Sequence, residues 1–204
     1  MASTSKTYDI VYADPPWRYN FIDKKNSGRN FSGKKGAYKP VISAEDHYDT
    51  MSVAEICAMG DQVKAMTSKD ALLYLWITGP LLIPCAQMVI EAWGFEYKQV
   101  AFVWEKELVQ PGAYTMTSVE FCLVAKKKGG KIPLPRGLRS VRQFVRSRRQ
   151  KHSAKPEEVR TRIERMHPFQ NKLEMFARVA SPGWDIWGNE VRSSVHLDLE
   201  VKDE

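Results

Sequence analysis

The feature that most constrains the fold is a short apolar run that ends abruptly at two prolines. Residues 9–17 read Asp-Ile-Val-Tyr-Ala-Asp-Pro-Pro-Trp, and the apolar part of this run is typical of a buried strand. Proline has no backbone N–H and a fixed φ, so the strand must end before Pro15. Asp14 is therefore predicted at the carboxyl end of a strand, where open α/β sheets bind their ligands.

The residues of this turn suit methyl transfer to an exocyclic amino group. The nitrogen of an aromatic amine such as that of adenine is a poor nucleophile, because its lone pair is delocalised into the ring. Asp14 and the carbonyl of Pro15 can each accept one amino hydrogen, and the pair Pro15 and Pro16 keeps these acceptors fixed. Trp17 offers a flat face on which an extruded base can stack. The alternative interpretation is a structural turn with Trp17 as an ordinary core side chain.

Composition limits the classes of protein to which the chain can belong. With 204 residues, we expect residues 1–204 to form one domain with a full hydrophobic core. The sequence has no apolar run of transmembrane length and no secretory leader, which predicts a soluble, cytoplasmic protein without a membrane partner. A formal net charge of +7 favours a polyanionic partner. The cysteines and histidines are widely separated, so neither disulfides nor a metal site is predicted.

Three segments lack the periodicity of helices or strands. Residues 1–7 are predicted to be a tail, and residues 192–204 an acidic, mobile tail. Residues 18–40 are rich in Gly, Ser, Asn and Lys, which predicts a long, mobile, basic loop beside the site. Its cations and aromatic side chains suit contact with phosphates and bases. A disordered insertion is the alternative for this loop.

Strand and helix signals alternate along the rest of the chain. Ser52 followed by Glu55 is a capping box, which predicts a short helix. Residues 136–151 fit either a helix or a short edge strand, and we favour the strand. This alternation predicts an α/β fold with a mostly parallel sheet and helices on both faces. Further strands are expected at 71–77, 95–104, 118–125 and 172–177, helices at 81–93 and from Pro156 to about Met166, and a basic turn at 126–130.

The motifs resemble those of the family of the catalytic subunit of the mRNA adenosine methyltransferase, whose prokaryotic and phage relatives are DNA adenine methyltransferases. They extend over most of the chain, from about residue 8 to residue 191. The resemblance implies a Rossmann-like fold that binds S-adenosylmethionine and needs no metal. It also implies a permuted order, in which the catalytic motif precedes the cofactor-binding strand. The motifs are Asp-Pro-Pro-Trp at 14–17, His-Tyr-Asp-Thr-Met-Ser at 47–52, Leu-Tyr-Leu-Trp-Ile-Thr-Gly at 73–79, Glu-Phe-Cys-Leu-Val at 120–124, Ser-Ala-Lys-Pro-Glu-Glu at 153–158, Glu-Met-Phe-Ala-Arg at 174–178 and Trp-Gly-Asn-Glu at 187–190.

The resemblance further implies roles for particular side chains. Lys155 is suited to pair with the carboxylate of the cofactor's methionine, and Arg178 and Asn189 are suited to bond its ribose hydroxyls. The catalytic motif is Asp14, Pro15, Pro16 and Trp17. The positions that match cofactor contacts are Asp14, Lys155, Phe176, Arg178, Asn189 and Glu190, and those expected around the target base are Trp17, Tyr48, Lys106 and Glu120.

The activity expected from these residues is N6 methylation of adenine in DNA, with S-adenosylmethionine as the methyl donor. An RNA adenosine methyltransferase would share every catalytic residue. A catalytically inactive partner subunit that binds nucleic acid is an alternative from a different class. Methylation of the amino group of cytosine or glutamine is another alternative, because Asp14 and the Pro15 carbonyl could accept its two hydrogens in the same way. The oligomeric state, monomer or homodimer, stays open, and a phage-encoded member would work in the host cytoplasm.

Overall fold

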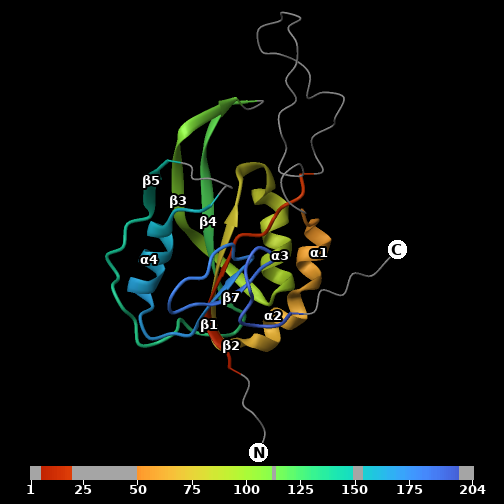
Figure 1. Ribbon diagram of the computed structural model, residues 1–204, viewed down its shortest axis with the longest axis vertical. Helices are drawn as coiled ribbons and strands as arrows, with labels where there is room; N and C mark the ends of the chain where they lie inside the picture. Colours follow the sequence, from red (N-terminus) through yellow and green to blue (C-terminus); the bar gives the residue numbers. More distant parts are fainter. Residues whose placement is uncertain (1–5, 20–49, 112–113, 149–153, 198–204) are drawn as a thin grey trace, which may run out of the picture.

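A seven-stranded sheet forms the centre of the molecule in the computed structural model, which describes residues 6–19, 50–111, 114–148 and 154–197 (Figure 1). The strand order is β5-β3-β4-β2-β1-β6-β7. All neighbouring strands are parallel except the pairs that include β4, so β4 alone runs against the others. The mostly parallel α/β sheet is therefore confirmed. The strands are β1 Tyr8–Ala13, β2 Thr67–Ile77, β3 Phe95–Pro111, β4 Met116–Lys127, β5 Phe144–Ser147, β6 Lys172–Met175 and β7 Asp185–Trp187.

Helices cover both faces of the sheet, as predicted. On one face, α1 (Val53–Ala58), α2 (Gly60–Met66) and α3 (Gln87–Ala92) pack over alternate residues of β1 and β2. On the other face, α4 (Glu157–Met166) packs over the residues between them. Because successive strand side chains point to opposite faces, the run Ile-Val-Tyr-Ala of β1 supplies both core clusters. The central strands are thus buried on both sides and hold the turn after β1 in place.

The helical predictions are correct at two of three places. The capping box is present, since the Glu55 N–H donates to Ser52 Oγ and the Ser52 N–H donates to Glu55 Oε2. Helix α4 occupies its expected position. The single helix expected at 81–93 is wrong, because the segment consists of a 3-10 turn η2 (Gly79–Leu81), a π-helical stretch η3 (Leu82–Ala86) and then α3. Pro84 cannot donate a helical hydrogen bond, and Ile83 before it is extended.

The strands differ from expectation mainly at their ends. The edge strand favoured within residues 136–151 is confirmed as β5. Strand β3 runs seven residues past its expected end at residue 104, and β4 begins two residues before its expected start at residue 118. Two lysines expected in a turn, Lys126 and Lys127, belong to β4. Strand β7 and helix α2 were not predicted, since three and seven residues give little periodic signal.

The predicted C-terminal tail is partly wrong. Residues 192–197 pack on the fold, where Ser194 N donates to the Ile186 carbonyl and Leu197 is buried. At the other end, Lys6 pairs with Asp185 of β7. The basic loop expected at 18–40 lies outside the described residues except for Arg18 and Tyr19. No helix in the described part of the chain is long and apolar enough to cross a membrane.

Candidate active site

The Asp-Pro-Pro turn lies at the carboxyl end of β1, as the sequence predicts. Strand β1 is flanked by β2 and β6, so its end is surrounded by the ends of two other parallel strands. A residue that follows the basic loop in the sequence holds Pro16 in place, because Met51 N donates to the Pro16 carbonyl at 2.7 Å. The carbonyl of Pro15 accepts the N–H of Trp17 at 2.9 Å. A carbonyl oxygen has two lone pairs, so Pro15 keeps one for a second donor.

Trp17 is a core side chain. Only 6% of its surface is exposed, and it belongs to the cluster under α1 and α3. Its indole N–H donates to the Trp76 carbonyl at 3.0 Å, and its backbone bridges Met51. These contacts anchor the turn to β2 and match the structural alternative for Trp17. A stacking role for its ring stays a prediction.

Lys155 links Asp14 to a second carboxylate. Its ammonium lies 2.7 Å from Asp14 Oδ1 and 3.3 Å from Glu120 Oε2. Lys106 completes the chain of charges at 2.8 Å from Glu120 Oε1. The ammonium of Lys155 also lies over the ring of Trp76. Four predicted site residues from four separate parts of the sequence therefore form one ionic network, in which cations and carboxylates alternate.

Burial and pairing oppose each other in this network. Burial raises the pKa of Asp14, and the neighbouring Lys155 only partly offsets this rise. Burial alone would lower the pKa of Lys155, but Asp14 and Glu120 together hold it above its ordinary value. Burial likewise works to raise the pKa of Glu120, yet Lys155 and Lys106 lower it overall. Lys155 therefore remains a cation at neutral pH.

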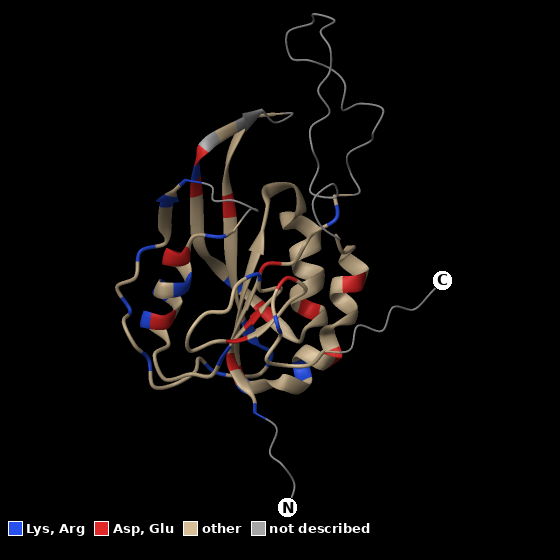
Figure 2. Cartoon of the chain, in the orientation of Figure 1, with Lys and Arg blue, Asp and Glu red and all other residues tan. Residues whose placement is uncertain are grey.

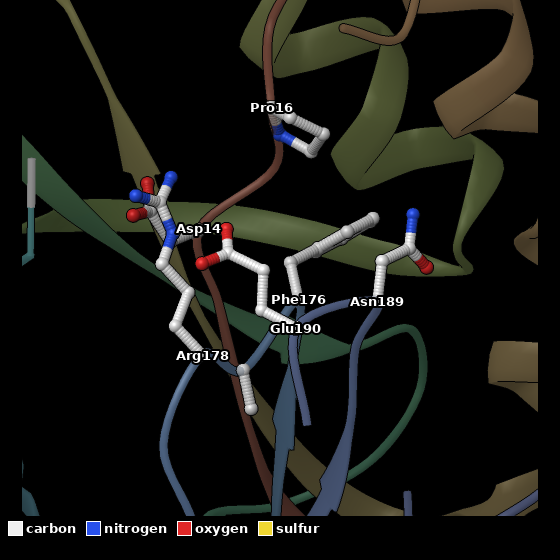
Figure 3. Close-up of a pocket in the computed structure, with 7 residues that line it drawn as sticks. Asp14, Pro16, Phe176, Arg178, Asn189 and Glu190 are labelled. Carbon is white, nitrogen blue, oxygen red and sulfur yellow. Dashed lines mark ion pairs between the residues drawn. The ribbon is translucent and has the colours of Figure 1, made fainter. Parts of the chain in front are cut away.

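A cavity of about 230 Å³ opens on the other side of Asp14. Figure 3 shows Asp14 and Arg178 on one side of it and Asn189 on the other, with Phe176 and Glu190 between them. Arg178 Nε lies 3.6 Å from Glu190 Oε1. Of the six residues predicted to contact the cofactor, five line this cavity, and the sixth, Lys155, contacts Asp14 from the side of Glu120. The lining residues are Asp14, Pro16, Phe176, Ala177, Arg178, Asn189 and Glu190.

The backbone at the floor of the cavity has two unusual features. Phe176 has a φ of 61°, a left-handed conformation that a side chain other than glycine rarely adopts. At Gly188, a Cβ atom would lie 2.1 Å from the Ala177 carbonyl oxygen, so only glycine fits there. Ala177 N donates to the Trp187 carbonyl at 2.9 Å. The chain thus turns sharply after β6 and passes close to the end of β7, which brings Arg178 and Asn189 around one cavity.

Two buried polar contacts that the sequence did not indicate hold α4 against the site. Arg160 donates to both carboxylate oxygens of Glu174 in β6, at 3.0 and 2.9 Å. Trp184, which precedes β7, donates its indole N–H to Glu164 at 2.7 Å. Because Lys155 lies directly before α4, these contacts fix its position relative to β6 and β7. Arg160 was missed because its spacing is that of an ordinary exposed helical residue.

A second cavity, of about 550 Å³, lies against β2, β4 and the end of α4. Tyr74 and His167 meet there, with Tyr74 Oη 2.9 Å from His167 Nε2. It contains none of the predicted site residues. Tyr48, predicted near the target base, lies outside the described residues. Within the described ranges, no group of three His, Cys, Asp or Glu side chains is placed to hold a metal ion.

The residues around the smaller cavity fit S-adenosylmethionine chemically. The cofactor carries a carboxylate, two ribose hydroxyls and a flat base. Arg178, Asn189 and Glu190 line the cavity with polar groups that ribose hydroxyls can bond. Lys155, paired with Asp14 at the border of the cavity, is the cation predicted for the carboxylate. Phe176 presents an aromatic ring at the same cavity, packed against Trp187 at 5.3 Å between ring centroids. The roles of these individual residues stay predictions.

The fold and this site define an α/β enzyme of the Rossmann-like methyltransferase class. The chain belongs to the MT-A70 family, whose model matches residues 8–190. It is 42% identical to the type II methyltransferase M.MunI of a Mycoplasma species over 188 aligned residues. The aligned region covers 91% of this chain and 78% of that protein.

More distant relatives include proteins named for RNA. The chain is 24% identical to the N6-methyladenosine RNA methyltransferase MTA1 of Pyricularia oryzae, over 94% of this chain and 49% of that protein. It is 29% identical to the N(6)-adenosine-methyltransferase MT-A70-like protein of Drosophila melanogaster, over 95% of this chain and 28% of that protein. The chain therefore spans half or less of the length of these two relatives.

Proposed function

We propose that this chain transfers the methyl group of S-adenosylmethionine to the exocyclic N6 amino group of adenine in DNA. The observation that carries the proposal is the position of Asp14, which borders the cavity on one side and the Lys155–Glu120–Lys106 network on the other. A methyl donor in the cavity and an amino acceptor beside the network would meet at this one carboxylate. The fixed turn supplies the orientation that such a displacement needs.

The acceptor side uses the free oxygens of the turn. Lys155 pairs with Oδ1 of Asp14, which leaves Oδ2 to accept one amino hydrogen of the base. The second lone pair of the Pro15 carbonyl accepts the other. Polarising both hydrogens draws the nitrogen toward a nucleophilic geometry, and this preorganised electrostatic contact is strongest in a site that excludes water. The bound cofactor would supply an electrophilic sulfonium methyl. The N–C bond would form as the S–C bond breaks, the neutral thioether would leave, and the amino nitrogen would lose one proton to solvent.

DNA is the proposed substrate because the relative with 42% identity is a type II methyltransferase, whereas the two RNA-named relatives are below 30%. The net charge of +7 suits either nucleic acid. An RNA methyltransferase is the second candidate, since the RNA-named relatives match more than nine-tenths of this chain. An inactive partner subunit is less consistent with the intact Asp14–Trp17 motif and the paired Lys155.

The test is transfer of a deuterated methyl group from S-adenosylmethionine to matched DNA and RNA oligonucleotides, followed by digestion and mass spectrometry of the nucleosides. The proposal predicts labelled N6-methyladenine from DNA at a rate well above that from RNA. Label on adenine in RNA alone would favour the second candidate. Label on the N4 amino group of cytosine would contradict the choice of adenine. Sequencing around each modified base would then give the recognition sequence.

A further inference from the structure

Strands β3 and β4 extend beyond the rest of the sheet as a free-standing hairpin (Figure 1). Strand β4 pairs with β2 only as far as Phe121, and β3 pairs with β5 only as far as Lys106. Beyond these points, β3 and β4 pair with each other alone, at Gln110–Thr117 and Pro111–Met116. We define the hairpin arm as residues 107–111 and 114–119. A two-stranded ribbon of this kind gains little stability by itself, so its projection calls for another explanation.

The hairpin arm exposes apolar side chains. Tyr114 is 99% exposed and Met116 61% exposed, and Val109 and Val119 are also exposed. Exposed apolar side chains gathered on one projecting element are typical of a segment that contacts a partner. The partner must accept an aromatic and a flexible thioether side chain at the end of a narrow ribbon.

The hairpin arm starts at the candidate active site. Glu120 and Lys106, which form the first ion pair below the arm, belong to the network that includes Lys155 and Asp14. From Glu120 to Met116 the strand extends about 13 Å at its usual rise per residue. That length exceeds the depth of a B-DNA groove, about 8.5 Å. If a target base lies beside Glu120, as the sequence predicts, the end of the arm can therefore reach the base stack from which that base came.

The charges beside the hairpin arm favour a polyanion. Residues 136–148, which include β5, contain five arginines and no Asp or Glu. Figure 2 shows these cations along β5 and the segment before it, on the edge of the sheet next to β3. Glu107 in the arm and Glu105 before it are paired with Arg148 and Arg146 at 2.9 and 3.1 Å, and Glu120 is paired with Lys106 and Lys155. Phosphates would therefore meet a cationic edge without repulsion from unpaired carboxylates.

We propose that the hairpin arm inserts Tyr114 and Met116 into duplex DNA beside the target adenine and fills the gap left by the extruded base. This inference rests on the proposed function and names the form of its substrate. Apolar side chains that enter a base step offset the cost of unstacking, and extrusion is required because the N6 group cannot reach Asp14 from within the duplex. A second copy of the chain is the alternative occupant of this arm, and the test below distinguishes it from DNA.

The test compares Tyr114→Ala/Met116→Ala with the wild-type chain on three unmethylated DNA substrates. Each contains a sequence in which the wild-type chain methylates adenine. The substrates are the duplex, the same strand alone, and a duplex in which the target adenine is mispaired. We expect the double variant to lose at least about tenfold in rate on the duplex, to lose less on the mispaired duplex, and to stay within about twofold on the single strand. Phe169→Ala, which removes an aromatic side chain that is 74% exposed outside the arm, is the matched control.

A second readout reports base extrusion directly. With 2-aminopurine at the target position, the wild-type chain should raise the fluorescence on binding, and the double variant should not. Equal rates of the variant and wild type on the duplex would overturn the inference while leaving the proposed function intact. Equal losses on duplex and single strand would also overturn it. A shift from dimer to monomer in sedimentation, with an unchanged rate on the duplex, would instead identify the arm as an interface between copies.

Discussion

Lys155 and Asp14 form an ion pair of 2.7 Å that joins the start of α4 to the end of β1. The pair is part of a network in which Glu120 also contacts Lys155. The geometry of this network depends on α4 and β6, which are joined by Arg160 and Glu174. Neither element contains a predicted catalytic residue. The position of the reactive carboxylate is therefore tied to packing contacts outside the motif, and these contacts can be tested separately from catalysis.

The buried pair Arg160–Glu174 should contribute strongly to stability. Their side chains are 21% and 11% exposed, and they meet through two hydrogen bonds. Arg160→Met leaves Glu174 buried without its partner and should lower the free energy of unfolding by about 3 kcal/mol. The double variant Arg160→Met/Glu174→Met should recover much of this loss. Urea unfolding measures both effects.

The exposed pair Lys64–Asp61 is the control for this experiment, since Lys64 Nζ lies 2.8 Å from Asp61 Oδ1 and Arg160 Nη2 lies equally close to Glu174 Oε2. Lys64→Met should change the free energy of unfolding far less than Arg160→Met does, because solvent screens an exposed pair. If Arg160→Met were as mild as Lys64→Met, α4 would not be held to β6 by this pair.

The left-handed conformation of Phe176 predicts an inverted preference between two small residues. Alanine normally stabilises a chain more than glycine, but at a φ of 61° glycine avoids the steric cost that alanine retains. Phe176→Gly should therefore be more stable than Phe176→Ala by about 1 kcal/mol, measured by thermal unfolding. Both variants lose the ring contact with Trp187 and should bind the cofactor more weakly.

The same two substitutions at the neighbouring Met175, inside β6, provide the control. There the alanine variant should be the more stable one, as is usual in a strand. The same order at both positions would show that the backbone of Phe176 carries no strain.

His167 predicts a specific loss of stability in mild acid. It is buried, and burial together with the nearby Lys172 and Arg136 lowers its pKa to about 4, compared with an ordinary value of 6.5. The unfolded chain therefore takes up a proton at a higher pH than the folded chain does. Above pH 6.5, His167 is neutral in both states and does not lower the free energy of unfolding. As the pH falls from 6.5 toward 4, the free energy of unfolding decreases, by about 2 kcal/mol at pH 5.

The measurement is urea unfolding of the wild-type chain and of His167→Gln between pH 7.5 and pH 5. Other groups titrate in both proteins, so the difference between the two curves isolates His167. That difference should shrink or reverse as the pH falls. Parallel curves would mean that folding does not lower the pKa of His167.

The sequence predicted the parts of the fold that depend on local patterns. The apolar run before Asp14 predicted a buried strand, which is β1. The family resemblance assigned Phe176, Arg178, Asn189 and Glu190 to one cofactor site, and all four line one cavity. The apolar spacing at 81–93 predicted a single helix, but Pro84 interrupts that helix.

Other features depend on partners that are distant in the sequence. The three residues of β7 form a strand because β6 pairs with them, and no periodic signal reveals so short an element. The hydrogen bond from the indole of Trp17 to the Trp76 carbonyl joins residues 59 positions apart, and no local pattern indicates it. Arg160 became informative only when Glu174 was found opposite it.

The central claim is that the carboxylate of Asp14 activates the amino group for methyl transfer. Its most direct test is the single-turnover rate of labelled methyl transfer to DNA by Asp14→Ala, with the unfolding midpoint measured on the same preparation. We expect the fold to persist, because Glu120 still pairs with Lys155, and the rate to fall by a factor of about 10² to 10³ or more. A folded variant that transfers the methyl group to adenine within about tenfold of the wild-type rate would contradict the account.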